Sequence, residues 1–229
     1  SGVSGGSFGA AVWSALLAEA GVDCASGPQT AEAGAARADL AAGAIDQDYL
    51  AAPMGSLFLT DLVWRHATPL NALLRLPGAV PGDRAAALER AWEWGYRRAT
   101  RGGERMAASF LAPWRSGEGG GWSFRRPLLF LNGTVQSSGL PIVAAPVALE
   151  PADFPASHDL LGHLRGDIRL STAVAASARF PYITPAGGLR DAGGTWRANV
   201  VDGGYFDNQG AGTLTDVARV LLRAAEGLP

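Results

Sequence analysis

Ser4 is the residue best suited to covalent chemistry, because it lies in Gly2-Val3-Ser4-Gly5-Gly6, a match to the G-x-S-x-G pattern. In that pattern a sharp strand-to-helix turn exposes one hydroxyl, and small neighbours relieve the crowded backbone. An apolar periodicity of 3.6 residues follows and predicts a helix up to about residue 20. The N–H of Gly5 would then lie at a helix N-terminus, where it could stabilise an oxyanion. The alternative is an ordinary Gly/Ser turn without chemistry.

A serine hydroxyl needs a base to take its proton, and histidine is the usual candidate. The histidines of the chain are His66, His158 and His163. A triad of Ser4, Asp153 and His163 would follow the chain order of α/β-hydrolases. His158 and His163, however, lie in a segment rich in Pro, Ser and Gly, which is typical of a surface loop. The sequence therefore favours surface positions for both.

A second candidate base is Asp202, which ends an apolar run of strand character and precedes Gly203-Gly204. A strand end can direct a carboxylate across the edge of a sheet, and two glycines allow close approach of a substrate. An aspartate with its ordinary pKa of about 3.9 is a weak base unless a dry pocket raises that pKa or geometry compensates. The alternative is a turn aspartate that caps its own backbone, since Asp-Gly is a common turn dipeptide.

Taken together, these segments resemble the patatin-like phospholipase family. The resemblance rests on Gly2-Val3-Ser4-Gly5-Gly6-Ser7, on Asp202-Gly203-Gly204, on residues 171–181 (STAVAASARFP) and on residues 205–211 (YFDNQGA). It covers the start of the chain and about residues 127–217. Members of that family use a Ser-Asp dyad without histidine, so the resemblance implies that Ser4 is the acyl-accepting nucleophile and Asp202 its general base. Gly5 would donate its N–H to the oxyanion.

The resemblance also implies a fold and a function. The expected fold is α/β, a layered domain over residues 1–229 with a central mixed or mostly parallel sheet flanked by helices. Residues from about 44 to 126 would form a helical insertion or lid. The expected function is hydrolysis of acyl esters of the phospholipid or lysophospholipid type, without a cofactor or metal. The partner would be a lipid or acyl ester, with peripheral membrane contact and a cytoplasmic or membrane-associated location.

One departure from the family pattern concerns the oxyanion hole. Family members carry a strand and a Gly-rich loop upstream of the nucleophile, whereas this sequence begins three residues before Ser4. We therefore expect the chain to lack its N-terminal strand and oxyanion loop, and to have impaired activity by itself. Loss of one oxyanion donor costs on the order of 10²- to 10³-fold in rate.

Three other hypotheses stay open at this point. The first is a His-dependent serine esterase that uses Ser4 with His158 or His163. The second is a non-catalytic lipid- or protein-binding domain on the same scaffold. An N-terminal-nucleophile hydrolase that uses Ser1 is the third, although its layered antiparallel sheets do not suit a helix directly after Ser4.

Composition excludes several other classes. With 229 residues, 48% of them apolar, and a net charge of −2, the chain is long enough for one globular domain and has no basic excess for nucleic acid. All 19 basic residues are arginine, so there is no lysine for a P-loop, a Schiff base or a Ser-Lys dyad. Cys24 is the only cysteine, which excludes an intrachain disulfide and a Cys-based zinc site.

The remaining elements follow from periodicity and punctuation. Residues 25–43 predict a weak helix or mobile insertion, and Asp46 is a candidate N-cap for the helical region 46–115. Further helices are expected after Gly82-Asp83 to about residue 101, at 171–179 and at 212–226; strands are expected at 127–131, 140–147 and 197–201. Five tryptophans of the helical middle could form a lid or acyl pocket, but core packing is favoured; they are Trp64, Trp92, Trp94, Trp114 and Trp122.

Overall fold

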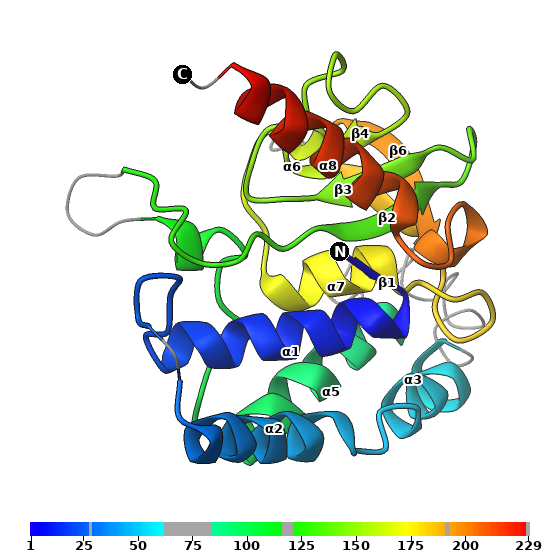
Figure 1. Cartoon of the computed structure of the whole chain (residues 1–229). Coiled ribbons are helices and arrows are strands. Elements are labelled where there is room, and N and C mark those ends of the chain that lie inside the picture. The colour runs from blue at the N-terminus through cyan, green and yellow to red at the C-terminus, as the bar shows by residue number, and fades with distance from the viewer. Residues whose placement is uncertain (28, 62–83, 116–120, 191–192, 228–229) are drawn as a thin grey trace.

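The computed structural model describes residues 1–27, 29–61, 84–115, 121–190 and 193–227. These residues form an α/β domain around a mixed six-stranded sheet with helices packed on its faces (Figure 1). The strands are β1 (Gly2–Val3), β2 (Leu131–Val135), β3 (Pro141–Ala144), β4 (His158–Asp159), β5 (Gly187–Arg190) and β6 (Trp196–Asp202). Their order is β4-β3-β2-β6-β5, and β1 pairs with β2.

The register on β2 is the feature of the sheet that matters most for the site. β1 pairs with β2 in parallel and β6 pairs with it antiparallel, one after the other along the chain of β2. Val3 is opposite Asn132, and Asp202 is opposite the next residue, Gly133. The ends of β1 and β6 therefore meet. β2 and β3 are also antiparallel, as are β5 and β6, so of the two expected arrangements the sheet is mixed, not mostly parallel.

Helices cover the sheet in layers (Figure 1). On one face α1 (Gly5–Glu19) and α7 (Leu170–Ser177) lie next to the strands. Beneath them lie α2 (Ala31–Ile45), α3 (Ala51–Gly55) and α5 (Arg84–Ala99). On the other face, α8 (Ala211–Glu226) crosses the sheet. The short α6 (Leu160–Leu164) lies beside β3 and β4, and its leucines pack in the same core cluster as α1 and α7.

Strand alternation divides the core into two clusters. Leu131 and Val200 point toward α7 and pack with Val174 and Val12 in the larger cluster. The neighbouring Phe130 points to the opposite face; the cluster there also contains Val143 and Leu149, against which Val217 and Val220 of α8 pack. Residues of β6 that are two positions apart share a face, so Asp202 lies on the α7 side with Val200.

The structure confirms the predicted helices that correspond to α1, α5, α7 and α8, and the strand at 197–201. Of the two interpretations of residues 25–43, the structure supports the helix, because 31–45 form α2, whose N-cap Thr30 accepts a hydrogen bond from the N–H of Ala33. Asp46 ends that helix, since its N–H donates to Ala42, so its assignment as an N-cap was wrong. The strand expected at 127–131 begins only at Leu131 and continues through Asn132-Gly133.

Within the described part of residues 44–126, helices occupy 51–61 and 84–99, whereas residues 100–111 and 121–126 form turns and irregular chain, so the expected helical region is helical only in part. A π-helical turn, Ser56–Asp61, follows α3. Trp92 and Trp114 are buried in the core, as the core-packing interpretation predicts, whereas Trp94 and Trp122 are about half exposed. Trp64, His66 and the Gly82-Asp83 boundary lie outside the described residues.

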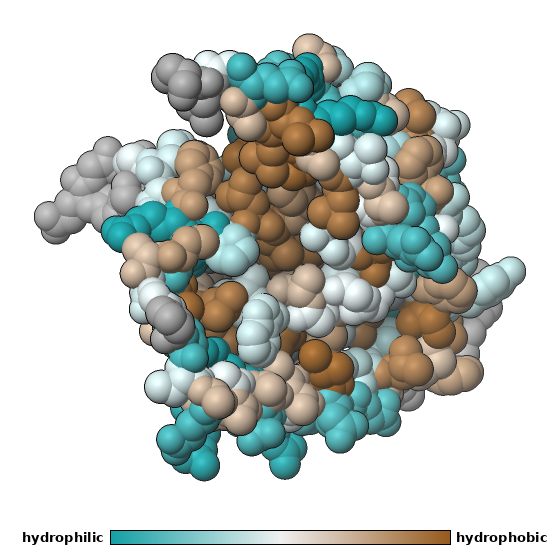
Figure 2. Space-filling view, in the orientation of Figure 1, coloured by the Kyte–Doolittle hydropathy of each residue, from teal (hydrophilic) through white to brown (hydrophobic). Residues whose placement is uncertain are grey.

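The face seen in Figure 2 carries an apolar area between α1 and α8. A cavity of about 240 Å³ lies between α1 and the segment that leads into β2, and its lining includes Trp13, Leu17 and Leu128.

Within the described residues, no helix has both the length and the apolar character needed to cross a membrane.

Candidate active site

Ser4 lies on a strained turn between β1 and α1. Its backbone has φ 52° and ψ −133°, a conformation that residues with a side chain rarely adopt and that costs on the order of 1–3 kcal/mol. Gly2 makes the turn possible, because a Cβ there would lie 2.8 Å from the Cα of Ser7. Gly6 has no such constraint, since a Cβ would meet nothing within 4 Å. The expected crowding thus holds on one side of Ser4 only.

The hydroxyl of Ser4 donates a hydrogen bond of 2.7 Å to Oδ2 of Asp202, across 198 positions of sequence. Asp202 is 3% exposed, and its Oδ1 accepts from the N–H of Gly204 at 2.8 Å. The structure confirms the turn-capping interpretation of Asp202, and the same carboxylate also accepts a hydrogen bond from the Ser4 hydroxyl. The capping bond fixes the carboxylate, and the other oxygen is left for Ser4.

The first two N–H groups of α1 are exposed beside Ser4. Gly5 and Gly6 begin the helix and lie at the surface. Among the described residues, neither amide has a hydrogen-bond acceptor, as expected for the first turn of a helix. These N–H groups can donate hydrogen bonds to a negatively charged oxygen, which the positive end of the helix dipole also stabilises. This is the position expected of the Gly5 donor.

The three-residue segment at the end of α7, which we call the 177–179 bridge, contacts the backbone of both Ser4 and Asp202. The carbonyl of Ser177 accepts from the N–H of Ser4 at 3.3 Å, and the carbonyl of Arg179 accepts from the N–H of Asp202 at 3.0 Å. The fully buried Ser177 hydroxyl also lies 2.6 Å from that of Ser7 and donates to the carbonyl of Asn132 at 2.5 Å. The bridge thus connects α1, β2 and β6.

Asn132 is a structural residue of the site that the sequence did not indicate. Its side-chain amide donates to the carbonyl of Gly2 at 2.8 Å and to the hydroxyl of Ser1 at 2.7 Å, and its Oδ1 accepts from Thr213 at 2.6 Å. Asn132-Gly133 is typical of a turn, but here it lies within the buried strand β2. Gly133 is required because a Cβ would lie 2.5 Å from the carbonyl oxygen of Ala176.

A cavity of about 300 Å³ opens beside Ser4 and Asp202. It is lined by Ser4, Phe180, Asp202, Gly204, Tyr205 and Asn208. The Phe180 and Tyr205 side chains are 56% and 59% exposed, so apolar rings flank the polar pair. Such a site can hold an uncharged group next to the Ser4 hydroxyl.

His158, His163 and Asp153, the other candidates within the described residues, do not reach Ser4. His158 lies on β4 and His163 on α6, and strands β3 and β2 lie between β4 and β1. The two imidazoles contact each other with ring centroids 5.3 Å apart, and burial together with the neighbouring His163 lowers the pKa of His158. Asp153 is paired with Arg223 at 2.7 Å. Among the sequence candidates that the structure describes, Asp202 alone has its side chain next to that of Ser4.

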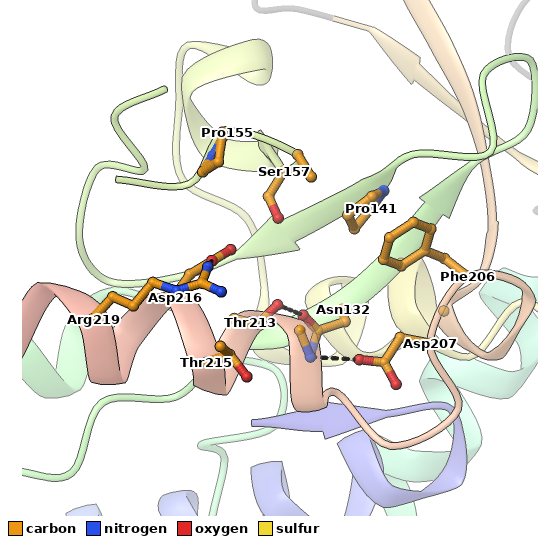
Figure 3. A pocket seen from close by; sticks show the side chains of 14 residues that line it. Asn132, Pro141, Pro155, Ser157, Phe206, Asp207, Thr213, Thr215, Asp216 and Arg219 are labelled. Atoms are coloured by element: carbon orange, nitrogen blue, oxygen red, sulfur yellow. Dashed lines mark hydrogen bonds and ion pairs between the residues drawn. The ribbon is translucent and has the colours of Figure 1, made fainter. Parts of the chain in front are cut away.

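A second hollow, of about 280 Å³, lies between the sheet and the first turns of α8 (Figure 3). Several of the polar groups in it are paired within the protein. Asp216 binds Arg219 at 2.8 Å, Thr213 binds Asn132, and Asp207 accepts from the N–H of Gly212 at 2.7 Å. Neither Ser4 nor Asp202 lines this hollow, so we assign its polar groups to holding α8 in place.

In the part of the chain that the structure describes, no group of three or more His, Cys, Asp or Glu side chains could hold a metal ion. No protein-family model, curated protein or solved structure matches the chain. The candidate site is therefore interpreted from its own geometry.

Proposed function

We propose that the chain is a serine acyl ester hydrolase of the patatin-like type, with a Ser4–Asp202 dyad. The observation that carries the proposal is the 2.7 Å hydrogen bond from the Ser4 hydroxyl to Asp202 at a strained strand-to-helix turn. Strained backbone conformations cluster at active sites, and a buried carboxylate next to that hydroxyl supplies a proton acceptor. The exposed N–H groups of Gly5 and Gly6 supply the anion-binding element that acyl transfer requires.

In the first step, Ser4 Oγ attacks the ester carbonyl while its proton passes to Asp202. The carbonyl oxygen becomes an oxyanion beside the N–H of Gly5, and the tetrahedral intermediate collapses to an acyl-serine. The alcohol leaves with the proton that Asp202 had taken. Water then attacks the acyl-serine and gives its proton to Asp202. Collapse of this second intermediate releases the fatty acid and returns the proton to Ser4.

The proposed substrate class is the fatty-acyl ester, as in phospholipids or lysophospholipids. Phe180 and Tyr205 offer apolar contact at the mouth of the cavity, which suits an acyl chain more than a sugar or a peptide backbone. Peripheral membrane contact at these rings is part of the proposal, because exposed aromatic side chains favour the membrane interface.

Active-site labelling tests the proposal. A fluorophosphonate probe is expected to modify Ser4, with the adduct located by peptide mass spectrometry. Asp202→Asn is expected to lower the labelling rate by about 10²-fold or more, because amide nitrogen and oxygen cannot take the proton. A His158→Ala/His163→Ala double variant serves as the control and is expected to label at the unaltered rate.

Two outcomes would overturn the proposal. If the histidine variant lost labelling while Asp202→Asn kept it, a His-dependent esterase would replace the dyad. If Ser4 resisted labelling in the folded protein, a non-catalytic lipid- or protein-binding domain would be favoured.

A further inference from the structure

The 177–179 bridge is the only segment among the described residues whose carbonyl groups bind the backbone N–H of both Ser4 and Asp202. We propose that Arg179 is a positioning residue for this pair, because its partly buried side chain fixes the segment that holds the two main chains in register. This inference rests on the proposed function, which supplies the role of Ser4 and Asp202. Arg179 itself lies outside the lining of the cavity at the dyad.

The guanidinium of Arg179 is held in a partly buried site between helix α5 and the segment before β5. Its side chain is 14% exposed, Nη1 donates to the carbonyl of Pro185 at 3.1 Å, and Nη2 lies 4.0 Å from Oε1 of Glu89 on α5. A buried guanidinium is stable only where acceptors surround it, so its position is restricted. Arg179 thereby ties the end of α7 both to the outer helix α5 and to the segment before β5.

The packing of Arg179 against β5 leaves no free space. A Cβ at Gly187 would lie 2.4 Å from Nε of Arg179 and 2.7 Å from its Cζ. Gly187 is paired with Val200 of β6, which is two residues before Asp202. The Arg179 side chain thus contacts the neighbour of β6, while its own carbonyl accepts from Asp202 at 3.0 Å. The side chain of Arg179 therefore packs against the strand next to β6, while its main chain binds Asp202 at the end of β6.

This arrangement matters for catalysis because proton transfer depends on heavy-atom distance. The Ser4 hydroxyl lies 2.7 Å from Asp202, within the range of about 2.6–3.2 Å that general-base catalysis needs. A displacement of about 1 Å can cost on the order of 10²-fold in rate. Loss of the guanidinium frees the 177–179 bridge to move. The distance between the backbones of Ser4 and Asp202, which the bridge holds, is then free to change as well.

The test compares Arg179→Met with Arg169→Met. Arg169 is a matched control because it also pairs with Glu89, at 3.7 Å. Its replacement by Met removes the same single positive charge as Arg179→Met. It lies at the other end of α7, has a side chain that is 53% exposed, and has no backbone contact to Asp202 among the described residues. Two readouts are used: hydrogen exchange of the Asp202 amide measured by NMR, and the saturating rate of fluorophosphonate labelling at Ser4.

We expect Arg179→Met to speed exchange of the Asp202 amide and to lower the saturating labelling rate by about tenfold or more, while the probe concentration for half-saturation stays unchanged. Exchange at core amides such as that of Val143 should keep its protection, which separates local loosening from global instability. Arg179→Lys is expected to restore part of the rate because one donor remains. Arg169→Met should match the wild type in both readouts.

If Arg179→Met fails to fold, Gly187→Ala gives the same test, because its methyl group displaces the guanidinium without removing the charge. Unaltered Asp202 exchange in the folded Arg179 or Gly187 variant would overturn the inference. So would faster exchange with an unaltered labelling rate. Failure of the proposed function looks different: the wild type itself would not label at Ser4, whatever the exchange at Asp202.

Discussion

Gly203 lies against the backbone of Asn132 so closely that a Cβ on Gly203 would stand 2.0 Å from the Asn132 carbonyl oxygen. This contact is at the point where β6 ends and the chain turns after Asp202. The same Asn132 carbonyl accepts from the Ser177 hydroxyl, so the turn after Asp202 and the bridge meet at one peptide group. The first glycine of the Asp-Gly-Gly sequence, Gly203, is thus a packing requirement of the site.

Gly203→Ala is therefore expected to damage both stability and the site. The methyl group must push the turn away from β2, which costs about 1–3 kcal/mol in the free energy of unfolding and displaces Asp202 from Ser4. Urea unfolding measures the first effect and Ser4 labelling the second. Gly188→Ala is the control, because a Cβ on this strand residue would have its nearest neighbour at 3.9 Å. Equal stability of the two variants would contradict the conclusion that close packing against Asn132 requires glycine at position 203.

The hydrogen bond from Thr213 to Asn132 gives a second prediction. Both side chains are buried, and the bond of 2.6 Å attaches the first turn of α8 to β2. Thr213→Val keeps the shape but leaves the Asn132 oxygen without its donor, so we expect a loss of about 1–3 kcal/mol in the free energy of unfolding. Thr215→Val is the matched control, because that exposed hydroxyl bonds only within α8, to Ala211. A comparable loss in both variants would show that the helix, not the link to β2, is affected.

The central part of the site could be predicted from the sequence because it depends on local chemistry. Small residues around Ser4 specify the turn, and an apolar run that ends in Asp202 specifies a strand end. The helix after Ser4 also follows directly from its apolar spacing. These are local signals, and the spatial meeting of Ser4 and Asp202 was expected only through the family resemblance.

The rest could not be predicted, because its causes are not local. The contacts of the 177–179 bridge use backbone carbonyls, which any sequence could supply. Asn132-Gly133 has the composition of a turn, but its place in the middle of the sheet overrides that preference. The helix α2 was underestimated because it buries only alanines, Ala41 and Ala44, so its apolar face carries no large residue to reveal the period.

The buried carboxyl of Glu89 gives a prediction for the pH dependence of stability. Burial raises the pKa of Glu89 above its ordinary value of 4.5, against the lowering effects of the Thr172 hydrogen bond and of Arg179 and Arg169. Between pH 4.5 and the raised pKa, the folded state holds a proton that the unfolded state has lost. The contribution of Glu89 to the free energy of unfolding is therefore fully present below pH 4.5 and declines as pH rises through the raised pKa.

Glu89→Gln should remove this decline, because glutamine does not titrate. Relative to the wild type, we expect the variant to be most destabilised near pH 4.5 and its deficit to shrink as the pH is raised toward neutrality. Glu93→Gln is the control with the same change of charge one turn along α5, where the carboxylate binds Ser171 and Arg169. Urea unfolding at a series of pH values measures both differences. A deficit of Glu89→Gln that grew with pH would mean that the ion pairs with Arg179 and Arg169 outweigh burial, because the ionised form would then be the one that the folded state prefers.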